Sequence, residues 1–157
     1  MVETMICLAR ANRAHRVIVG GQDGPDLFIE LYRRGYARLT TTGSCRIPCG
    51  QFDVALMAGR RQSARELAAA LGRFVHFLDA AGVLAVGLET ADGAASEQLR
   101  RTLDLLGFRI EAGSRCGDGV VVAARRLSIQ PARQRHVVYV TSGGPPVAQA
   151  GALKQRA

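Results

Sequence analysis

The feature that most constrains the fold is an alternation of short apolar runs with amphipathic helical patterns along most of the chain. Short runs rich in β-branched or apolar residues predict strands within 15–21, 36–42, 52–58 and 82–89. Strands that alternate with helices assemble into a parallel sheet with right-handed crossovers. The predicted fold class is therefore α/β, a three-layer sandwich around a mostly parallel sheet of about six strands.

Helix signals fill the intervals between these strands. Pro25 stands at a first helical position and Gly35 at a C-terminal cap, so a helix is expected between them. A capping box from Ser63 to Glu66 opens a long helix, expected to end near Gly82. Its apolar stripe consists of Leu67, Leu71, Phe74 and Leu78.

The C-terminal part of the chain departs from the alternation of strands and helices. Ser96 is a credible N-cap for a helix that stops at Gly107. Residues 108–126 form two extended runs joined by Gly-Asp-Gly, which predicts an antiparallel β-hairpin. We therefore expect the chain to consist of three regions: an N-terminal arm or helix at 1–14, one α/β domain at 15–126, and a stretch at 127–157. That stretch contains an edge-strand candidate, RHVVYVT, and a tail expected to be flexible.

The formal net charge of +8 points toward an acidic partner such as nucleic acid. The arginines are scattered as pairs at the ends of different predicted elements, namely Arg33-Arg34, Arg60-Arg61, Arg100-Arg101 and Arg125-Arg126. Scattered charges are more typical of a solvated surface than of a binding patch. Nucleic-acid contact through these arginines is retained as the weaker alternative.

Four cysteines in 157 residues do not form a secreted disulfide framework. No apolar run approaches the ~20 residues that span a bilayer, and the start MVETMICLAR lacks a signal-peptide pattern. We therefore expect a cytoplasmic protein with no membrane association. The C-x3-C spacing of Cys45 and Cys49 favours ordinary loop cysteines over a metal site, and a redox-responsive thiol pair beside Arg46 is the open alternative.

Three stretches, in this order, resemble the Rossmann-like (class I) S-adenosylmethionine-dependent methyltransferases. They are IPCGQFDVALMAG, LGRFVHFLDAAGVLAVGLE and LDLLGFRIEAGSRCGDGVVVAARR. With the first strand and helix, the resemblance covers roughly residues 15–126. It implies a Rossmann-like sandwich that ends in a hairpin, and S-adenosylmethionine as the cofactor. Residues 127–157 lie outside it.

The resemblance places a cofactor loop in VIVGGQDGPD. Gly20 and Gly24 keep the family's glycine spacing, Gln22 replaces the middle glycine, and Gly21 and Asp23 are additional candidates. Thr40, Thr41 and Thr42 stand where the family has the carboxylate that binds the ribose hydroxyls, and Thr41 is taken as the candidate among them. The candidate cofactor-binding residues are thus Gly20, Gly21, Asp23, Gly24 and Thr41. The alternative is that these glycines only form a tight strand-to-helix turn.

A complete family member has a further strand and helix before IPCGQFDVAL, so one βα unit is missing. The sequence after the fourth family strand is Ala58-Gly59-Arg60-Arg61, and no catalytic residue is assigned. Asp53 is expected to have a structural role, while Glu89 at a strand's carboxyl end is the better ligand contact. Two hypotheses follow: a methyltransferase-like domain that binds S-adenosylmethionine, or a non-catalytic regulatory or interaction module used for homodimerisation or nucleic-acid contact.

Overall fold

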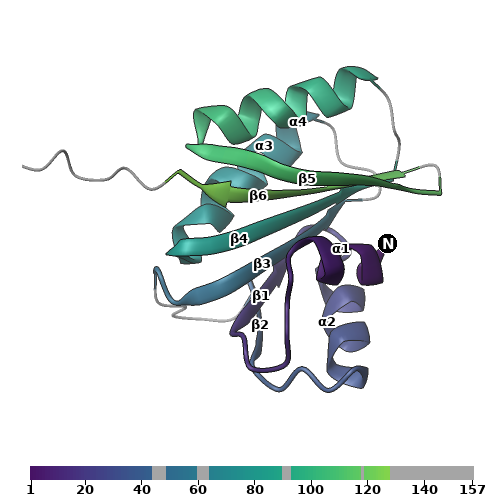
Figure 1. Cartoon of the computed structure of the whole chain (residues 1–157), viewed down its shortest axis with the longest axis vertical. Helices are drawn as coiled ribbons and strands as arrows, with labels where there is room; N and C mark the ends of the chain where they lie inside the picture. Colours follow the sequence, from purple (N-terminus) through teal and green to yellow (C-terminus); the bar gives the residue numbers. More distant parts are fainter. Residues whose placement is uncertain (44–48, 60–63, 90–92, 118, 128–157) are drawn as a thin grey trace, which may run out of the picture.

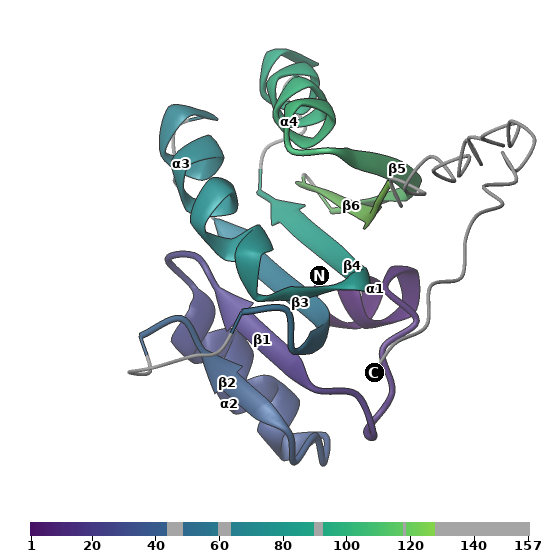
Figure 2. The same ribbon diagram turned by 90° about the vertical axis from the view of Figure 1, so that its left-hand side faces the viewer.

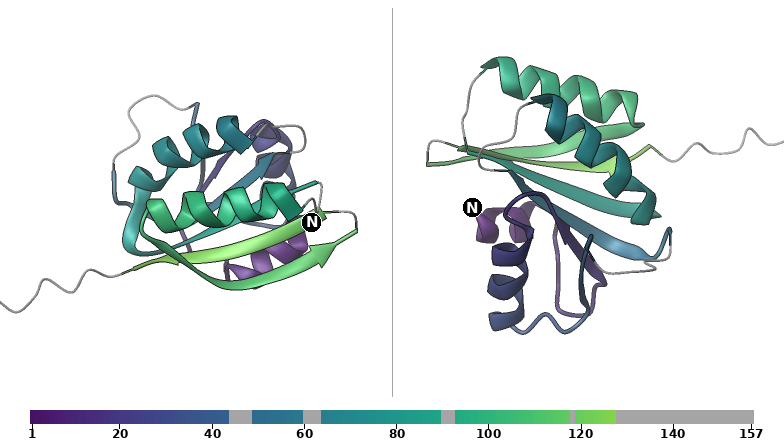
Figure 3. Two further views of the ribbon diagram at one scale, coloured as in Figure 1. Left: turned by 90° about the horizontal axis from the view of Figure 1, so that it is seen from above. Right: turned by 180° about the vertical axis from the view of Figure 1, so that it is seen from behind.

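The computed structural model describes residues 1–43, 49–59, 64–89, 93–117 and 119–127. A six-stranded sheet lies between two helical layers, with α3 and α4 on one face and α1 and α2 on the other (Figures 1 and 3). The helices are α1 (Val2–Leu8), α2 (Gly24–Arg33), α3 (Ala64–Phe74), the short 3₁₀ helix η1 (Val75–Phe77) and α4 (Gly93–Leu105). The strands are β1 (Val17–Gly20), β2 (Leu39–Thr41), β3 (Phe52–Gly59), β4 (Leu78–Leu88), β5 (Phe108–Cys116) and β6 (Gly119–Arg126).

The strand order is β2-β1-β3-β4-β6-β5. Strands β2, β1, β3 and β4 are mutually parallel, whereas β6 runs antiparallel to both β4 and β5. This confirms the predicted α/β class and the mostly parallel sheet that ends in a hairpin. After β1 the chain moves outward to β2 and then returns to the other side of β1, so the strand order reverses between β1 and β3.

The sheet separates two apolar cores. Ala55 and Met57 of β3 pack with α3 and α4, while Val54 and Leu56 pack with α1 and α2. Because β3 is buried on both faces beyond Asp53, residues 54–59 form a continuous apolar run rather than an alternating one.

The connection between β2 and β3 is short. Only the ten residues 42–51 separate the end of β2 at Thr41 from the start of β3 at Phe52. Ten residues are too few for a further helix and strand, in keeping with the βα unit that the resemblance marks as missing. Among the described strands, β2 forms one edge of the sheet, as Figure 2 shows.

The prediction of a long helix ending near Gly82 is wrong. Helix α3 ends at Phe74, and Leu78 is already the first residue of β4, paired with Phe52. Leu78 shares the helical spacing of the stripe, but its burial comes from sheet pairing. Gly82 lies in the irregular part of β4, where a Cβ would come within 3.0 Å of the Asp79 carbonyl oxygen. Gly82 therefore allows the close backbone packing of an irregular strand, and it does not end a helix.

Two other boundaries also differ from prediction. Helix α4 begins at Gly93, so Ser96 lies inside the helix and is not its N-cap. Its predicted end is confirmed, since Gly107 has φ +76°. The predicted strand at 36–42 is shorter in the structure, at Leu39–Thr41. Tyr36 precedes it, is buried, and donates its hydroxyl to the Ala11 carbonyl at 3.1 Å.

Several expectations fall on residues outside the described ranges. These are the Ser63 cap, the Cys45 thiol, the paired arginines Arg60 and Arg61, and the edge-strand candidate and tail within 128–157. They stay predictions. The N-terminal arm, in contrast, contains the short helix α1, which packs over β4, β5 and β6.

Asp53 joins the amino ends of β1 and β3, which agrees with its expected structural role. Its carboxylate accepts from the Arg16 backbone N–H at 2.7 Å and pairs with the Arg16 guanidinium at 3.0 Å. The hydrogen bond from the Arg16 side chain is the main cause that lowers the pKa of Asp53.

This pair predicts an acid-dependent stability difference between the wild type and Asp53→Asn. Because the folded pKa of Asp53 lies below its unfolded value of about 3.9, the pair stabilises the fold above that pH. Its contribution is lost as the pH falls through the lower, folded pKa. Urea unfolding at several pH values should show the wild-type advantage at about pH 6 and its loss near pH 2. A difference in the free energy of unfolding between the two proteins that does not change with pH would contradict this prediction.

Candidate functional site

The turn that follows β1 is built on two glycines with different constraints. Gly21 has φ +88°, a left-handed conformation that side chains disfavour. The turn packs onto the end of β3, since Asp23 N–H points to the Ala58 carbonyl at 3.5 Å. Gly24 N–H donates to the Gly21 carbonyl at 3.1 Å and leads into α2.

Close packing explains why positions 20 and 21 are occupied by glycine. A Cβ on Gly20 would lie 2.6 Å from the Phe74 ring, and a Cβ on Gly21 would collide with the Ala58 carbonyl oxygen. Gly24 differs, because a Cβ there meets nothing within 4 Å. The tight-turn alternative for the first two glycines therefore has a direct physical basis.

A cavity of about 540 Å³ opens beside this turn, where β1, β2 and β3 end. We call it the switch-point cavity, because it lies where the strand order reverses. It is lined by Gly21, Gln22, Thr42, Met57, Ala70, Arg73, Phe74 and Phe77. In open α/β sheets, ligands bind at this position, outside the carboxyl ends of the strands.

The lining has two chemical parts. Met57, Phe74 and Phe77 form an apolar wall, which suits a flat hydrophobic or heteroaromatic group. Gln22 and Thr42 supply an amide and a hydroxyl, and Arg73 supplies a positive charge on the exposed side of α3. No Asp or Glu is among the described residues that line this cavity.

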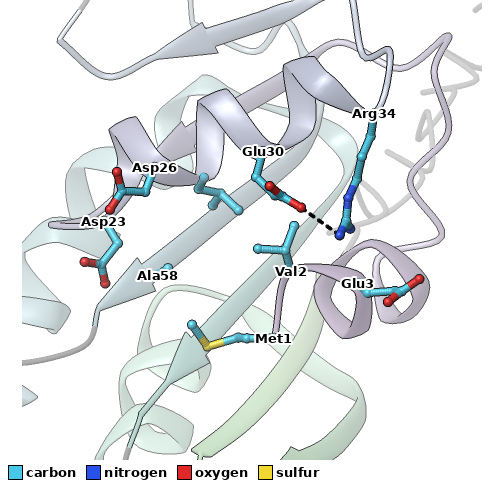
Figure 4. A pocket seen from close by; sticks show the side chains of 9 residues that line it. Met1, Val2, Glu3, Asp23, Asp26, Glu30, Arg34 and Ala58 are labelled. Carbon is cyan, nitrogen blue, oxygen red and sulfur yellow. Dashed lines mark ion pairs between the residues drawn. The ribbon is translucent and has the colours of Figure 1, made fainter.

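A second cavity of about 350 Å³ lies on the other face of the sheet, between α1 and α2 (Figure 4). We call it the acidic cavity, because Glu3, Asp23, Asp26 and Glu30 are in its lining. The one cationic side chain among its described lining residues is Arg34, which pairs with Glu30 at 2.8 Å. Gly21 lines the switch-point cavity and Asp23 lines the acidic one, so the turn stands between them.

The five candidate cofactor residues thus have different positions. Gly21 lines the switch-point cavity, Asp23 lines the acidic cavity, and Gly20 and Gly24 are buried in the turn. Thr41 ends β2, and the next residue, Thr42, lines the switch-point cavity.

Sequence reasoning missed Arg73, Phe74 and Phe77 as lining residues. Phe74 had been recognised only as part of a helical stripe, and nothing local marks Arg73. Glu89, the ligand contact preferred from the sequence, is exposed just after β4 and does not line either cavity.

The described cysteines are free thiols. Cys49 is exposed, while Cys116 at the hairpin end accepts a hydrogen bond from the Thr4 hydroxyl at 3.7 Å. The N-terminal ammonium and Thr4 both lower the pKa of Cys116. Among the described residues, no group of three or more His, Cys, Asp or Glu side chains is placed to hold a metal ion. No helix in the described ranges has the length and apolar character needed to cross a membrane.

No protein-family model and no curated protein matches the chain. Solved structures do match it. The 1,6-didemethyltoxoflavin N1-methyltransferase of Burkholderia thailandensis, solved with S-adenosylhomocysteine, has a TM-score of 0.58 at 16% identity. The match covers 80% of this chain and 77% of that one.

Two further structures are similar to the same extent. The ribosomal protein L11 methylase of Lactobacillus delbrueckii subsp. bulgaricus has a TM-score of 0.58 at 13% identity, covering 80% of this chain and 77% of its own. The [4+2]-cyclase SpnF has a TM-score of 0.57 at 13% identity, covering 80% and 79%. The chain therefore has the Rossmann-like fold of the class I S-adenosylmethionine-dependent methyltransferases, a fold that the cyclase also uses.

Proposed function

We propose that this chain is a binding domain of methyltransferase fold, and that it holds S-adenosylmethionine or S-adenosylhomocysteine in the switch-point cavity. The observation that carries the proposal is the cavity's place at the carboxyl ends of β1, β2 and β3, beside the Gly21 turn. Its volume of about 540 Å³ is within the range of small-molecule sites. The similarity to a structure solved with S-adenosylhomocysteine adds support.

The lining fits most of such a ligand. In this proposal Arg73 pairs with the carboxylate of the amino-acid end, and Phe77 packs against the purine. Thr42 offers a single hydroxyl to the ribose, in place of a carboxylate that would accept from both ribose hydroxyls. When bound, S-adenosylmethionine supplies an electrophilic methyl group on a positively charged sulfur.

The fit is better for the neutral thioether than for the sulfonium. Arg73 repels the sulfonium charge, and none of the described residues lining the cavity supplies a carboxylate to offset it. We therefore expect S-adenosylhomocysteine to bind more tightly than S-adenosylmethionine. The proposal covers binding, and it assigns neither a methyl acceptor nor a catalytic residue.

Calorimetric titration with both ligands tests this. We expect dissociation constants on the order of 1–100 µM for the wild type. Arg73→Gln should raise the dissociation constant of S-adenosylhomocysteine about three- to tenfold, since it removes one partly solvated charge contact. Arg100→Gln, an exposed arginine on α4, is the matched control and should bind like the wild type. Absence of heat and of a thermal shift at about millimolar ligand would refute binding.

The position of β2 at the end of the described sheet favours a second candidate function, a non-catalytic interaction module. An uncovered strand edge invites pairing with another chain, so a homodimer through β2 is one form of this role. Light scattering at working concentration tests for the homodimer, and a monomeric mass would exclude it.

Nucleic-acid contact is the other form of this role. Arg16, Arg34, Arg101 and Arg125 are already paired with carboxylates, which weakens the basic surface that nucleic acid would meet. If nucleic acid does bind, its affinity should fall steeply with salt as phosphate contacts release counterions. An affinity that salt leaves unchanged would exclude this form.

A further inference from the structure

The switch-point cavity has one formally charged side chain among its described lining residues, the guanidinium of Arg73. Arg73 is exposed on α3, and it forms no ion pair within the part of the chain that the structure describes. Arg34 at the acidic cavity differs, because Glu30 already neutralises it. An arginine that stands beside a cavity without a carboxylate partner is available to an anion that enters from solvent.

Two neutral side chains add hydrogen-bond donors to the same cavity. The Gln22 amide and the Thr42 hydroxyl are in its lining, and both residues are exposed to solvent. Neither side chain is hydrogen-bonded to another described residue. The turn after β1, the end of β2 and helix α3 thus each contribute one donor that has no protein acceptor in the described ranges.

The apolar part of the lining suits a flat ring. Phe77 in η1 is half-buried, so part of its ring remains open to a ligand. Ala70 and Arg73, three residues apart, lie on the same side of α3, and the small alanine side chain leaves room beside the arginine. Aromatic bases stack well on such rings. The cavity therefore combines a surface for a base with a cation for an anionic group.

The amino-acid end of S-adenosylhomocysteine matches this lining less well than a phosphate does. That end has a carboxylate and an ammonium group on the same carbon. Arg73 attracts the carboxylate and repels the ammonium, and none of the described lining residues offers a carboxylate to the ammonium. A phosphate monoester has no attached cation, and near neutral pH it has a charge of about −1.5 to −2 and three acceptor oxygens.

We infer that the switch-point cavity is a site for nucleoside 5′-monophosphates. The base packs against Phe77, and the phosphate accepts from Arg73, Gln22 and Thr42. The inference rests on the proposed function in one respect, since both place the ligand in this cavity. Beyond that function, it names the class of ligand that the cavity binds most tightly.

Calorimetric titration of the full chain with adenosine 5′-monophosphate (AMP), adenosine and S-adenosylhomocysteine tests it. AMP and adenosine differ by the phosphate alone, so the ratio of their dissociation constants measures what the phosphate contributes. We expect AMP to bind about tenfold more tightly than adenosine, and more tightly than S-adenosylhomocysteine. Inorganic phosphate at the same concentration should not displace AMP, because it lacks the contact of the base with Phe77.

Substitutions of exposed arginines locate the phosphate. Arg73→Gln should reduce the preference for AMP over adenosine to about twofold or less, since the donors that remain are neutral. Arg73→Lys keeps the positive charge and should retain most of the preference. Arg100→Gln, on the exposed side of α4, is the matched control and should leave the preference unchanged.

Three outcomes overturn the inference in a protein that binds S-adenosylhomocysteine, and they leave the proposed function standing. The first is equal affinity for AMP and adenosine. The second is an AMP affinity that Arg73→Gln does not change, since the phosphate then binds elsewhere. The third is displacement of AMP by inorganic phosphate, since the site then holds an anion without a base.

Two other outcomes separate the nucleotide from the S-adenosyl ligands. Absence of binding by AMP, adenosine and S-adenosylhomocysteine refutes both the inference and the proposed function. Binding of AMP that depends on Arg73, without detectable binding of S-adenosylhomocysteine, supports the nucleotide site and refutes the S-adenosyl ligands.

Discussion

Replacement of Phe74 with alanine is expected to lower the free energy of unfolding by about 3–5 kcal/mol, the largest effect of a single substitution that we anticipate. Phe74 is 1% exposed, ends α3 and belongs to the core between α3, α4 and the sheet. Its removal leaves a cavity under the turn after β1, which rigid strand ends cannot fill. Urea unfolding followed by circular dichroism measures the change. Phe74→Leu, which keeps most of the volume, should cost about 1.5 kcal/mol or less.

The same experiment tests why residue 20 is glycine. Gly20→Ala places a methyl group against the Phe74 ring, where the ideal Cβ lies 2.6 Å from Cε2. We expect it to cost about 1–3 kcal/mol in the wild type and clearly less in the Phe74→Leu background, where the neighbour is smaller and more flexible. Equal costs in both backgrounds would show that the ring does not exclude a side chain. Loss of ligand binding in a Gly20 variant should therefore be interpreted only after its stability is known.

Gly21→Ala is the second large effect, expected at about 2–4 kcal/mol. A side chain at φ +88° costs about 1–2 kcal/mol, and its collision with the Ala58 carbonyl adds a similar amount. Gly107→Ala is a matched control, because Gly107 has φ +76° but nothing within 4 Å of its ideal Cβ. The control should cost only the backbone part, about 1–2 kcal/mol.

The difference between the two glycine variants isolates the contact between the turn and β3. If Gly21→Ala costs no more than Gly107→Ala, the turn moves freely away from Ala58. In that case the two cavities are not held apart as the structure shows. A cost well above the control supports a turn that is fixed against β3, with the switch-point cavity preformed on one side of it.

The layered fold was predictable because its signals are local or periodic. Buried strands such as Phe52–Gly59 are continuous apolar runs, and helix ends are marked by residues such as Pro25 and Gly35. The Gly-Asp-Gly turn predicted the closing hairpin, and the order of elements predicted parallel pairing. The position of Leu78 was not predictable in this way, since a leucine four residues after Phe74 fits both a helix and the strand that it begins.

Residue types alone were enough to predict the fold class, the glycine turn after the first strand and the short connection before the third. Each of these depends on residue type and spacing within a short window. Only the tertiary structure showed that Arg73, Phe74 and Phe77 meet Gly21 and Thr42 at one cavity, and that Asp23 faces another. These relations join residues far apart in the chain, and sheet order and packing decide which of them come together.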